Sequence, residues 1–154
     1  MLYTREFFQA IKQRLADEHG CFVMHAESSI TRPHAFQQIA TTLRAVWPEV
    51  HFVHLYIQMY ATLWSIAIAG ERDAVASTTE GILAERLQRR QVGPLSAYTP
   101  ASHHAMQVGF PFIDQLLTTA DQLPVITDEA STFADEIDLN ISVAANDLNR
   151  RLNP

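Results

Sequence analysis

Residues 50–70, VHFVHLYIQMYATLWSIAIAG, decide the fold class of this chain. β-branched and aromatic residues dominate the stretch, and both kinds favour extended backbone. They predict two strands, over residues 50–60 and 63–69, joined by a tight connection and paired antiparallel. A shorter apolar run, CFVMHA at residues 21–26, predicts a third strand that is buried.

Amphipathic helices are predicted around these strands, because apolar residues recur at helical spacing on either side of them. Thr4 and Thr31 are placed as N-caps of the first two. The helices are expected over residues 4–17, 31–47, 77–90 and 101–120, the last interrupted near Pro111. This order indicates an α/β protein with a partial sheet, because a complete doubly wound domain usually has five or more strands.

The composition narrows the class of protein. With 154 residues, of which 47% are hydrophobic, the chain suits one compact domain and is too apolar to be disordered. Its net charge of −6 argues against nucleic-acid binding, which needs clustered Lys and Arg. No apolar run approaches the roughly 20 residues of a membrane span, so we expect no membrane association. The single cysteine makes the cytoplasm the expected compartment.

The glycines exclude one large group of functions. They are Gly20, Gly70, Gly81, Gly93 and Gly109. At this spacing they cannot form a G-x-G-x-x-G or Walker loop. We therefore expect the chain by itself to bind no nucleotide cofactor.

The sequence also gives little support for a metal site or for a catalytic nucleophile. His51 and His54 are three apart on a predicted strand and point to opposite faces, and no Cys pair or HExxH accompanies them. Cys21 lies in a predicted buried strand, where a small apolar role is the simpler interpretation. We expect no metal site and no catalytic residue in this chain.

A three-stranded sheet would leave a long edge of unpaired backbone groups. Such edges are normally paired or covered. We therefore expect a partner, either a second copy in a homodimer or another chain.

The strand ends carry the most informative polar residues. The end of the first strand supplies His25, Glu27 and Ser28, and the end of the second supplies Tyr60. In open α/β sheets, ligands lie outside the carboxyl ends of the strands. A carboxylate with aromatic faces beside it attracts a cation, so an amine is the ligand that would fit. The alternative is that these are ordinary loop residues.

Four segments resemble spermidine synthases and related polyamine aminopropyltransferases, in that family's order and spacing over about residues 2–117. They are LYTREFFQAIKQRLADEHGCFVMHAES, AFQQIATTLRAVWPEV, LYIQMYATLWSIAIAG and LSAYTPASHHAMQVGFP. The last is similar to the family signature Tyr-Asn-Pro-x-x-His-x-Ala-Phe-x-x-Pro, with Thr99 in place of Asn.

The resemblance implies a Rossmann-like, methyltransferase-type sheet of about three strands with flanking helices, lacking its N-terminal half. Residues 1–120 would be the C-terminal half of a spermidine synthase-like domain. Residues 121–154 would be an extension with an amphipathic helix, whose apolar face could pack on its own body or on a second subunit. The residues on that face are Phe133, Ile137, Ile141, Ala144, Ala145, Leu148 and Leu152.

The resemblance also implies a function. In the family, an aminopropyl group passes from decarboxylated S-adenosylmethionine to a diamine, and the donor loop and catalytic Asp would precede Met1. We therefore expect the chain to be inactive alone and to have a polyamine as its ligand. Its partner would be either a second copy of the chain or a separate N-terminal half. Tyr60 falls near the family's substrate-facing Tyr, His25 falls at its substrate-side Gln, and Glu27 lies in the loop that follows. The alternative is a noncatalytic binding or interaction module derived from the same fold.

Overall fold

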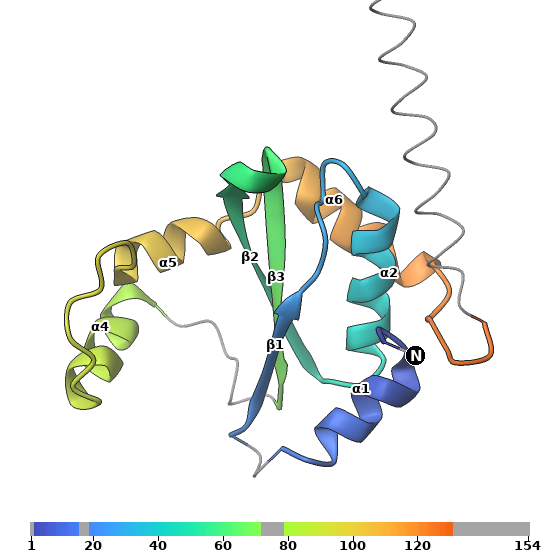
Figure 1. The fold of residues 1–154 in the computed structure, drawn as a ribbon, viewed down its shortest axis with the longest axis horizontal. Helices are drawn as coiled ribbons and strands as arrows, with labels where there is room; N and C mark the ends of the chain where they lie inside the picture. Colours follow the sequence, from blue (N-terminus) through green and yellow to red (C-terminus); the bar gives the residue numbers. More distant parts are fainter. Residues whose placement is uncertain (1, 16–18, 72–78, 131–154) are drawn as a thin grey trace, which may run out of the picture.

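The computed structural model describes residues 2–15, 19–71 and 79–130. Within them, one sheet contains β1 (Cys21–His25), β2 (Glu49–Ile57) and β3 (Thr62–Gly70). β3 lies between the other two strands and is antiparallel to both (Figure 1). This arrangement confirms the predicted antiparallel hairpin and the third strand.

A short turn joins β2 to β3. The 3₁₀ turn η1 (Gln58–Tyr60) ends β2 earlier than predicted, and Ala61 then takes a left-handed conformation with φ of 50°. The turn fixes the register, in which Leu55 lies opposite Trp64 and Phe52 lies opposite Ala67.

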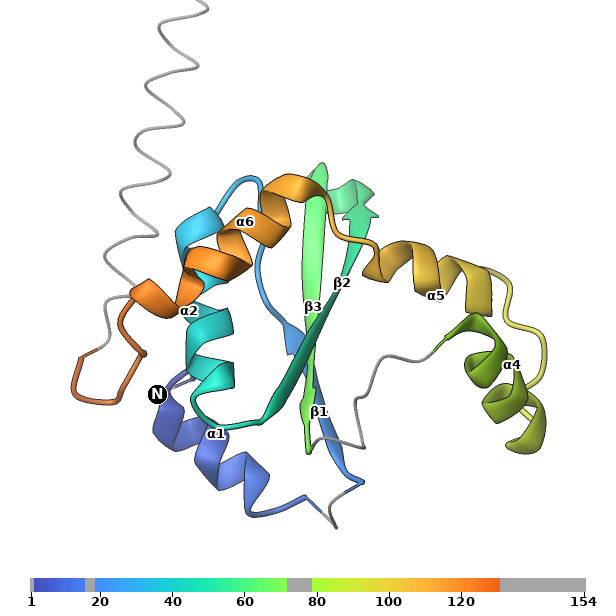
Figure 2. The same ribbon diagram turned by 180° about the vertical axis from the view of Figure 1, so that it is seen from behind.

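Helices cover the two faces of the sheet unequally. One face packs against α1 (Arg5–Lys12), α2 (Pro33–Arg44) and α6 (Pro111–Thr119), which continues into η2 (Ala120–Gln122). Figures 1 and 2 show α4 (Glu80–Arg89) and α5 (Pro100–Gln107) on the other side. Neither α4 nor α5 contains a buried residue, so this side of the described sheet is thinly covered.

The hydrophobic core lies between the sheet and the first group of helices. It contains Phe8, Phe36, Ile39, Leu43, Trp47, Phe52, Ala67, Ala69 and Ile113, all buried. Phe36 of α2 meets Phe52 of β2 edge to face, with ring centroids 5.1 Å apart. The apolar stripe predicted for the second helix is thus confirmed.

Two local predictions were wrong. Thr31 does not cap α2, because the helix begins at Pro33 and Arg32 therefore holds the cap position; Arg32 makes no side-chain cap hydrogen bond. Cys21 is exposed rather than buried. The reason is that β1 is an edge strand whose Phe22 and Met24 take the core side, so Cys21 points away from it.

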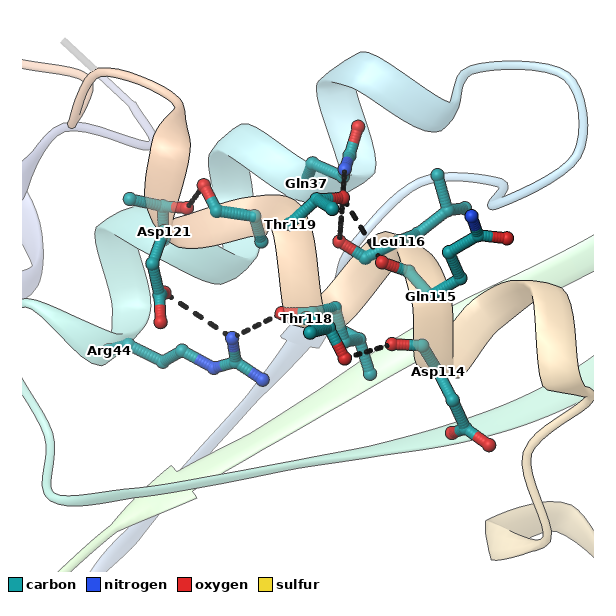
Figure 3. Close-up of polar contacts among 11 residues, drawn as sticks. Gln37, Arg44, Asp114, Gln115, Leu116, Thr118, Thr119 and Asp121 are labelled. Atoms are coloured by element: carbon teal, nitrogen blue, oxygen red, sulfur yellow. Dashed lines mark hydrogen bonds and ion pairs between the residues drawn. The ribbon is translucent and has the colours of Figure 1, made fainter.

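Polar contacts fix α6 on α2, as Figure 3 shows. Gln37 donates from Nε2 to the Leu116 carbonyl and to the Thr119 hydroxyl, both at 2.9 Å. Arg44 donates to the Leu117 carbonyl at 2.8 Å and pairs with Asp121 at 3.4 Å. These bonds give partners to carbonyls near the end of α6 and hold this end against α2.

Residues 120–130 are held against α1 and α2 through Ile126. Ile126 is buried, its amide donates to Thr42 Oγ1 at 3.1 Å, and its carbonyl accepts from the Arg5 amide at 2.8 Å. The expected helix beyond them lies outside the described residues, and the division at residue 120 stays a prediction. None of the described helices is both long and apolar enough to span a membrane.

Candidate functional site

The end of β1 is tied to the start of β3 beyond the regular ladder. Ala26 donates to the Ser65 carbonyl at 2.8 Å, and the Ser65 amide donates to the Glu27 carbonyl at 2.9 Å. Glu27 has a φ of 66°, a left-handed conformation that is uncommon for a residue with a side chain. This bulge-like irregularity places Glu27 beside Ser65, the sequence neighbour of Trp64.

Ser28 orders the loop that follows. Its hydroxyl is fully buried, lies 2.9 Å from the hydroxyl of Thr62 and accepts from the amide of Ile30 at 3.2 Å. Ser28 therefore positions its neighbours and is not open to a ligand.

Trp64 links two of the three predicted binding residues. Its indole N–H donates to His25 Nδ1 at 2.9 Å, and its ring lies 4.6 Å from that of Tyr60, centroid to centroid. Tyr60 is 46% exposed and His25 is exposed, so aromatic surface remains accessible at this end of the sheet. The structure thus gathers His25 and Tyr60 around a residue that sequence reasoning did not select.

The carboxylate of Glu27 is only partly satisfied. The side chain is 16% exposed, and Oε1 lies 3.8 Å from Arg32 Nη1. Oε2 is buried and has no hydrogen-bond partner among the described residues. A buried carboxylate oxygen without a donor is costly, so this position favours a cationic or N–H-bearing ligand.

We call His25, Glu27, Tyr60 and Trp64 the strand-end site. At this end of the sheet lie the carboxylate of Glu27, near Arg32, and the two aromatic rings and the imidazole that meet at Trp64. Carboxylates and aromatic faces are groups that attract an organic ammonium group. In the part of the chain that the structure describes, no three His, Cys, Asp or Glu side chains lie together in a way that could hold a metal ion.

The family-like signature near residue 100 is an architectural element. The Tyr98 hydroxyl lies 2.8 Å from His103 Nδ1, and Thr99 and Ser102 form a capping box at the start of α5. Burial raises the pKa of Tyr98 and lowers the pKa of His103, which His104 also lowers. These contacts order α5 rather than form a ligand site.

His54 is the residue from which we expect a pH dependence of stability. It is buried against Phe36, and its Nδ1 lies 3.0 Å from Ser65 Oγ. Burial lowers its pKa, while the charge of Asp114 opposes that shift. As the pH falls, the unfolded chain therefore binds a proton at this residue before the folded chain does. The stability that the neutral, buried imidazole contributes is complete above the unfolded pKa of about 6.5, and it is lost as the pH falls toward the pKa of the folded chain.

We expect the free energy of unfolding to fall between pH 7.5 and pH 5.5, with a smaller fall in a His54→Asn variant. Urea unfolding at several pH values measures both slopes. His34→Gln, which replaces an exposed histidine of α2, is the matched control and should keep the wild-type slope. Equal slopes in all three proteins would contradict this assignment.

Comparisons with known proteins agree with this architecture. No protein-family model matches the chain. The polyamine aminopropyltransferase of Nitrosomonas europaea is 30% identical over 117 residues, covering 76% of this chain and 36% of that protein. The polyamine aminopropyltransferase of Saccharolobus solfataricus is 28% identical over 103 residues, covering 67% of this chain and 33% of that protein.

Two solved structures share the fold. A spermidine synthase in complex with the transition state analogue AdoDATO superposes with a TM-score of 0.65 at 22% identity, covering 76% of this chain and 40% of that one. Spermidine synthase from Thermotoga maritima gives a TM-score of 0.62 at 21% identity, covering 76% of this chain and 39% of that one.

The fold is therefore a partial Rossmann-like α/β domain of the spermidine synthase type. Over about three quarters of its length, the chain is homologous to part of the polyamine aminopropyltransferases, which confirms the resemblance noted in the sequence. It spans about a third of the length of those curated relatives.

Proposed function

We propose that this chain supplies the amine-binding part of a polyamine aminopropyltransferase-like protein and has no transferase activity alone. The observation that carries the proposal is the buried Oε2 of Glu27, which has no hydrogen-bond partner among the described residues. The backbone carbonyl of Glu27 accepts from Ser65, the residue after Trp64, whose ring packs with that of Tyr60. The aromatic faces attract the ammonium group and the carboxylate neutralises it. The single cysteine favours a cytoplasmic protein.

The proposed partner is the remainder of a spermidine synthase-like fold, here called the donor half. For experiments we define it as the part of the Nitrosomonas europaea relative that lies outside the match, which covers only 36% of that protein. The donor half would bind decarboxylated S-adenosylmethionine and supply the catalytic Asp. The chain would complete the enzyme by presenting the amine.

The free edge of β1 is the proposed junction. Because Ala26 bonds to β3, the alternation of an antiparallel ladder turns the amides of Val23 and His25 outward, away from β3. The strand CFVMH carries no carboxylate, lysine, arginine or proline, the residues that usually protect an edge. Val23 is 55% exposed opposite Ile68, so apolar surface adjoins the open edge.

A Glu27→Gln variant tests the amine site. Loss of the charge is expected to weaken binding of n-butylamine, a probe with one ammonium group, by about tenfold, the scale of one charged hydrogen bond. The shift of the Trp64 indole N–H resonance in the 154-residue chain reports binding.

The matched control is Glu129→Gln, which removes the same charge at an exposed residue. It should leave butylamine affinity unchanged. Equal affinities of the Glu27 and Glu129 variants, or no response of the Trp64 resonance to the amine, would remove the basis for an amine site.

A further inference from the structure

A cavity lies between the edge strand β2 and the helices α5 and α6. Its volume is about 360 Å³, which is enough for a small organic molecule. The apolar part of its wall comes from β2 and α6 and includes Val50, Ile113 and Leu117. None of the four residues of the strand-end site lines this cavity, so it is a separate place on the described chain.

Two side chains of opposite charge line the cavity without pairing to each other. Arg44 donates from Nη1 to the Leu117 carbonyl at 2.8 Å and to Asp121 at 3.4 Å, and its Nε and Nη2 make no hydrogen bond to another described residue. Within the described part of the chain, the Asp114 carboxylate makes neither a hydrogen bond nor an ion pair. Figure 3 shows it apart from the Arg44 guanidinium.

Helix α6 sets the spacing of these two charges. Asp114 and Leu117 are three residues apart, so they are neighbours on one face of the helix, about one turn apart. Because Arg44 is bound to the Leu117 carbonyl, its guanidinium lies about 5 Å or somewhat more from the Asp114 carboxylate, the scale of a helical turn. One small molecule can therefore reach both charged groups.

A buried imidazole borders the same cavity. His54 is 7% exposed, its Nδ1 lies 3.0 Å from Ser65 Oγ, and its Nε2 makes no hydrogen bond to another described residue. When the Nδ1–H group donates to Ser65, Nε2 is a hydrogen-bond acceptor. The charge of Asp114 acts on this ring, so the two groups border the same part of the cavity. A buried ring nitrogen without a partner favours a polar ligand.

We propose that this cavity binds a small zwitterion, an aminocarboxylate whose two charged ends are separated by a short carbon chain. Arg44 takes the carboxylate through Nε and Nη2, a two-point geometry that the planar guanidinium favours. Asp114 takes the ammonium group, and His54 Nε2 accepts a hydrogen bond from it. The apolar wall, with Val50 and Leu117, covers the carbon chain. A ligand with one charge alone would be repelled either by Asp114 or by Arg44.

Three probes with five carbons test the two ends separately. We expect the 154-residue chain to bind 5-aminopentanoate about tenfold more tightly than pentanoate or n-pentylamine, because each single-ended probe leaves one charged hydrogen bond unmade. Shifts of the backbone amides of Gln107 and Gly109, which line the cavity, report binding. Equal affinities for the three probes, no response of these amides, or tighter binding of inorganic phosphate would overturn the proposal.

Variants assign each end of the ligand. Asp114→Asn should weaken binding of 5-aminopentanoate by about tenfold without weakening that of pentanoate, and Arg44→Gln should weaken it as much without weakening that of n-pentylamine. Arg44 also holds α6, so urea unfolding establishes that its variant is folded, and the exposed Asp114 supplies the decisive test if it is not.

The matched controls are Glu85→Gln and Arg89→Gln, which remove the same charges from exposed positions of α4. Neither should change the affinity for 5-aminopentanoate. An Asp114→Asn variant that binds this probe as tightly as Glu85→Gln would overturn the proposal.

The cavity and the strand-end site can be told apart by their signals. The amides of Gln107 and Gly109 report the cavity, and the Trp64 indole reports the strand end. Glu27→Gln should therefore leave the response of the cavity amides to 5-aminopentanoate unchanged. An equal loss of affinity in Glu27→Gln and Asp114→Asn would overturn the proposal, whereas a cavity that binds nothing would leave the proposed amine site standing.

Discussion

Assembly of the 154-residue chain with the donor half is expected to turn an inactive polypeptide into an aminopropyltransferase. With decarboxylated S-adenosylmethionine and 1,4-diaminobutane, the complex should release methylthioadenosine, and the chain alone should release none. The physical reason is that transfer needs donor and amine held together, which is worth many powers of ten in rate. Chromatographic measurement of methylthioadenosine follows both reactions.

The donor half by itself is the necessary control, because it contains the donor site without the strand-end site. It should also be inactive. Sustained turnover by the purified chain alone would contradict the proposed function. A complex that forms and binds amines but releases no methylthioadenosine would favour the noncatalytic module instead.

A Val23→Lys substitution is expected to weaken that assembly by about 100-fold, because it places an unpaired charge in an apolar junction. Val23 is 55% exposed in the described chain, so the same change should alter the free energy of unfolding of the chain alone by no more than about 0.5 kcal/mol. Sedimentation of the mixed halves measures the first effect, and urea unfolding measures the second.

Val23→Thr is the matched variant, since it keeps the β-branched shape without the charge. It should assemble nearly as tightly as the wild type. Unimpaired assembly of Val23→Lys would place the junction elsewhere. A second copy of this chain, sedimenting as a dimer that Val23→Lys dissociates, would replace the donor half as the occupant of the edge.

The regular part of the fold was predictable because its signals are local. Residues 50–70 combine β-branched and aromatic residues with a short break, and they form the β2–β3 hairpin as expected. The apolar spacing of the second helix likewise predicted its buried face. The exposure of Cys21 was not predictable in this way, since it depends on which strand lies at the edge of the sheet.

The candidate site was only partly predictable for a similar reason. Position after a strand identified His25, Glu27 and Tyr60, but Trp64 follows a turn and appeared only as a strand residue. Its role depends on the cross-strand geometry that brings its indole to His25. The one signal in the sequence was that Trp64 is a large aromatic residue close to the turn between β2 and β3.

The exchange rates of the outward-facing amides of β1 test the central claim most directly. Hydrogen exchange in the 154-residue chain, measured with and without the donor half, compares Val23 and His25 with Met24, which faces β3 in the ladder. If a strand of the donor half pairs with β1, exchange at Val23 and His25 should slow by at least about tenfold, while Met24 changes little. Unchanged exchange at Val23 and His25 in a complex that does form would contradict the account.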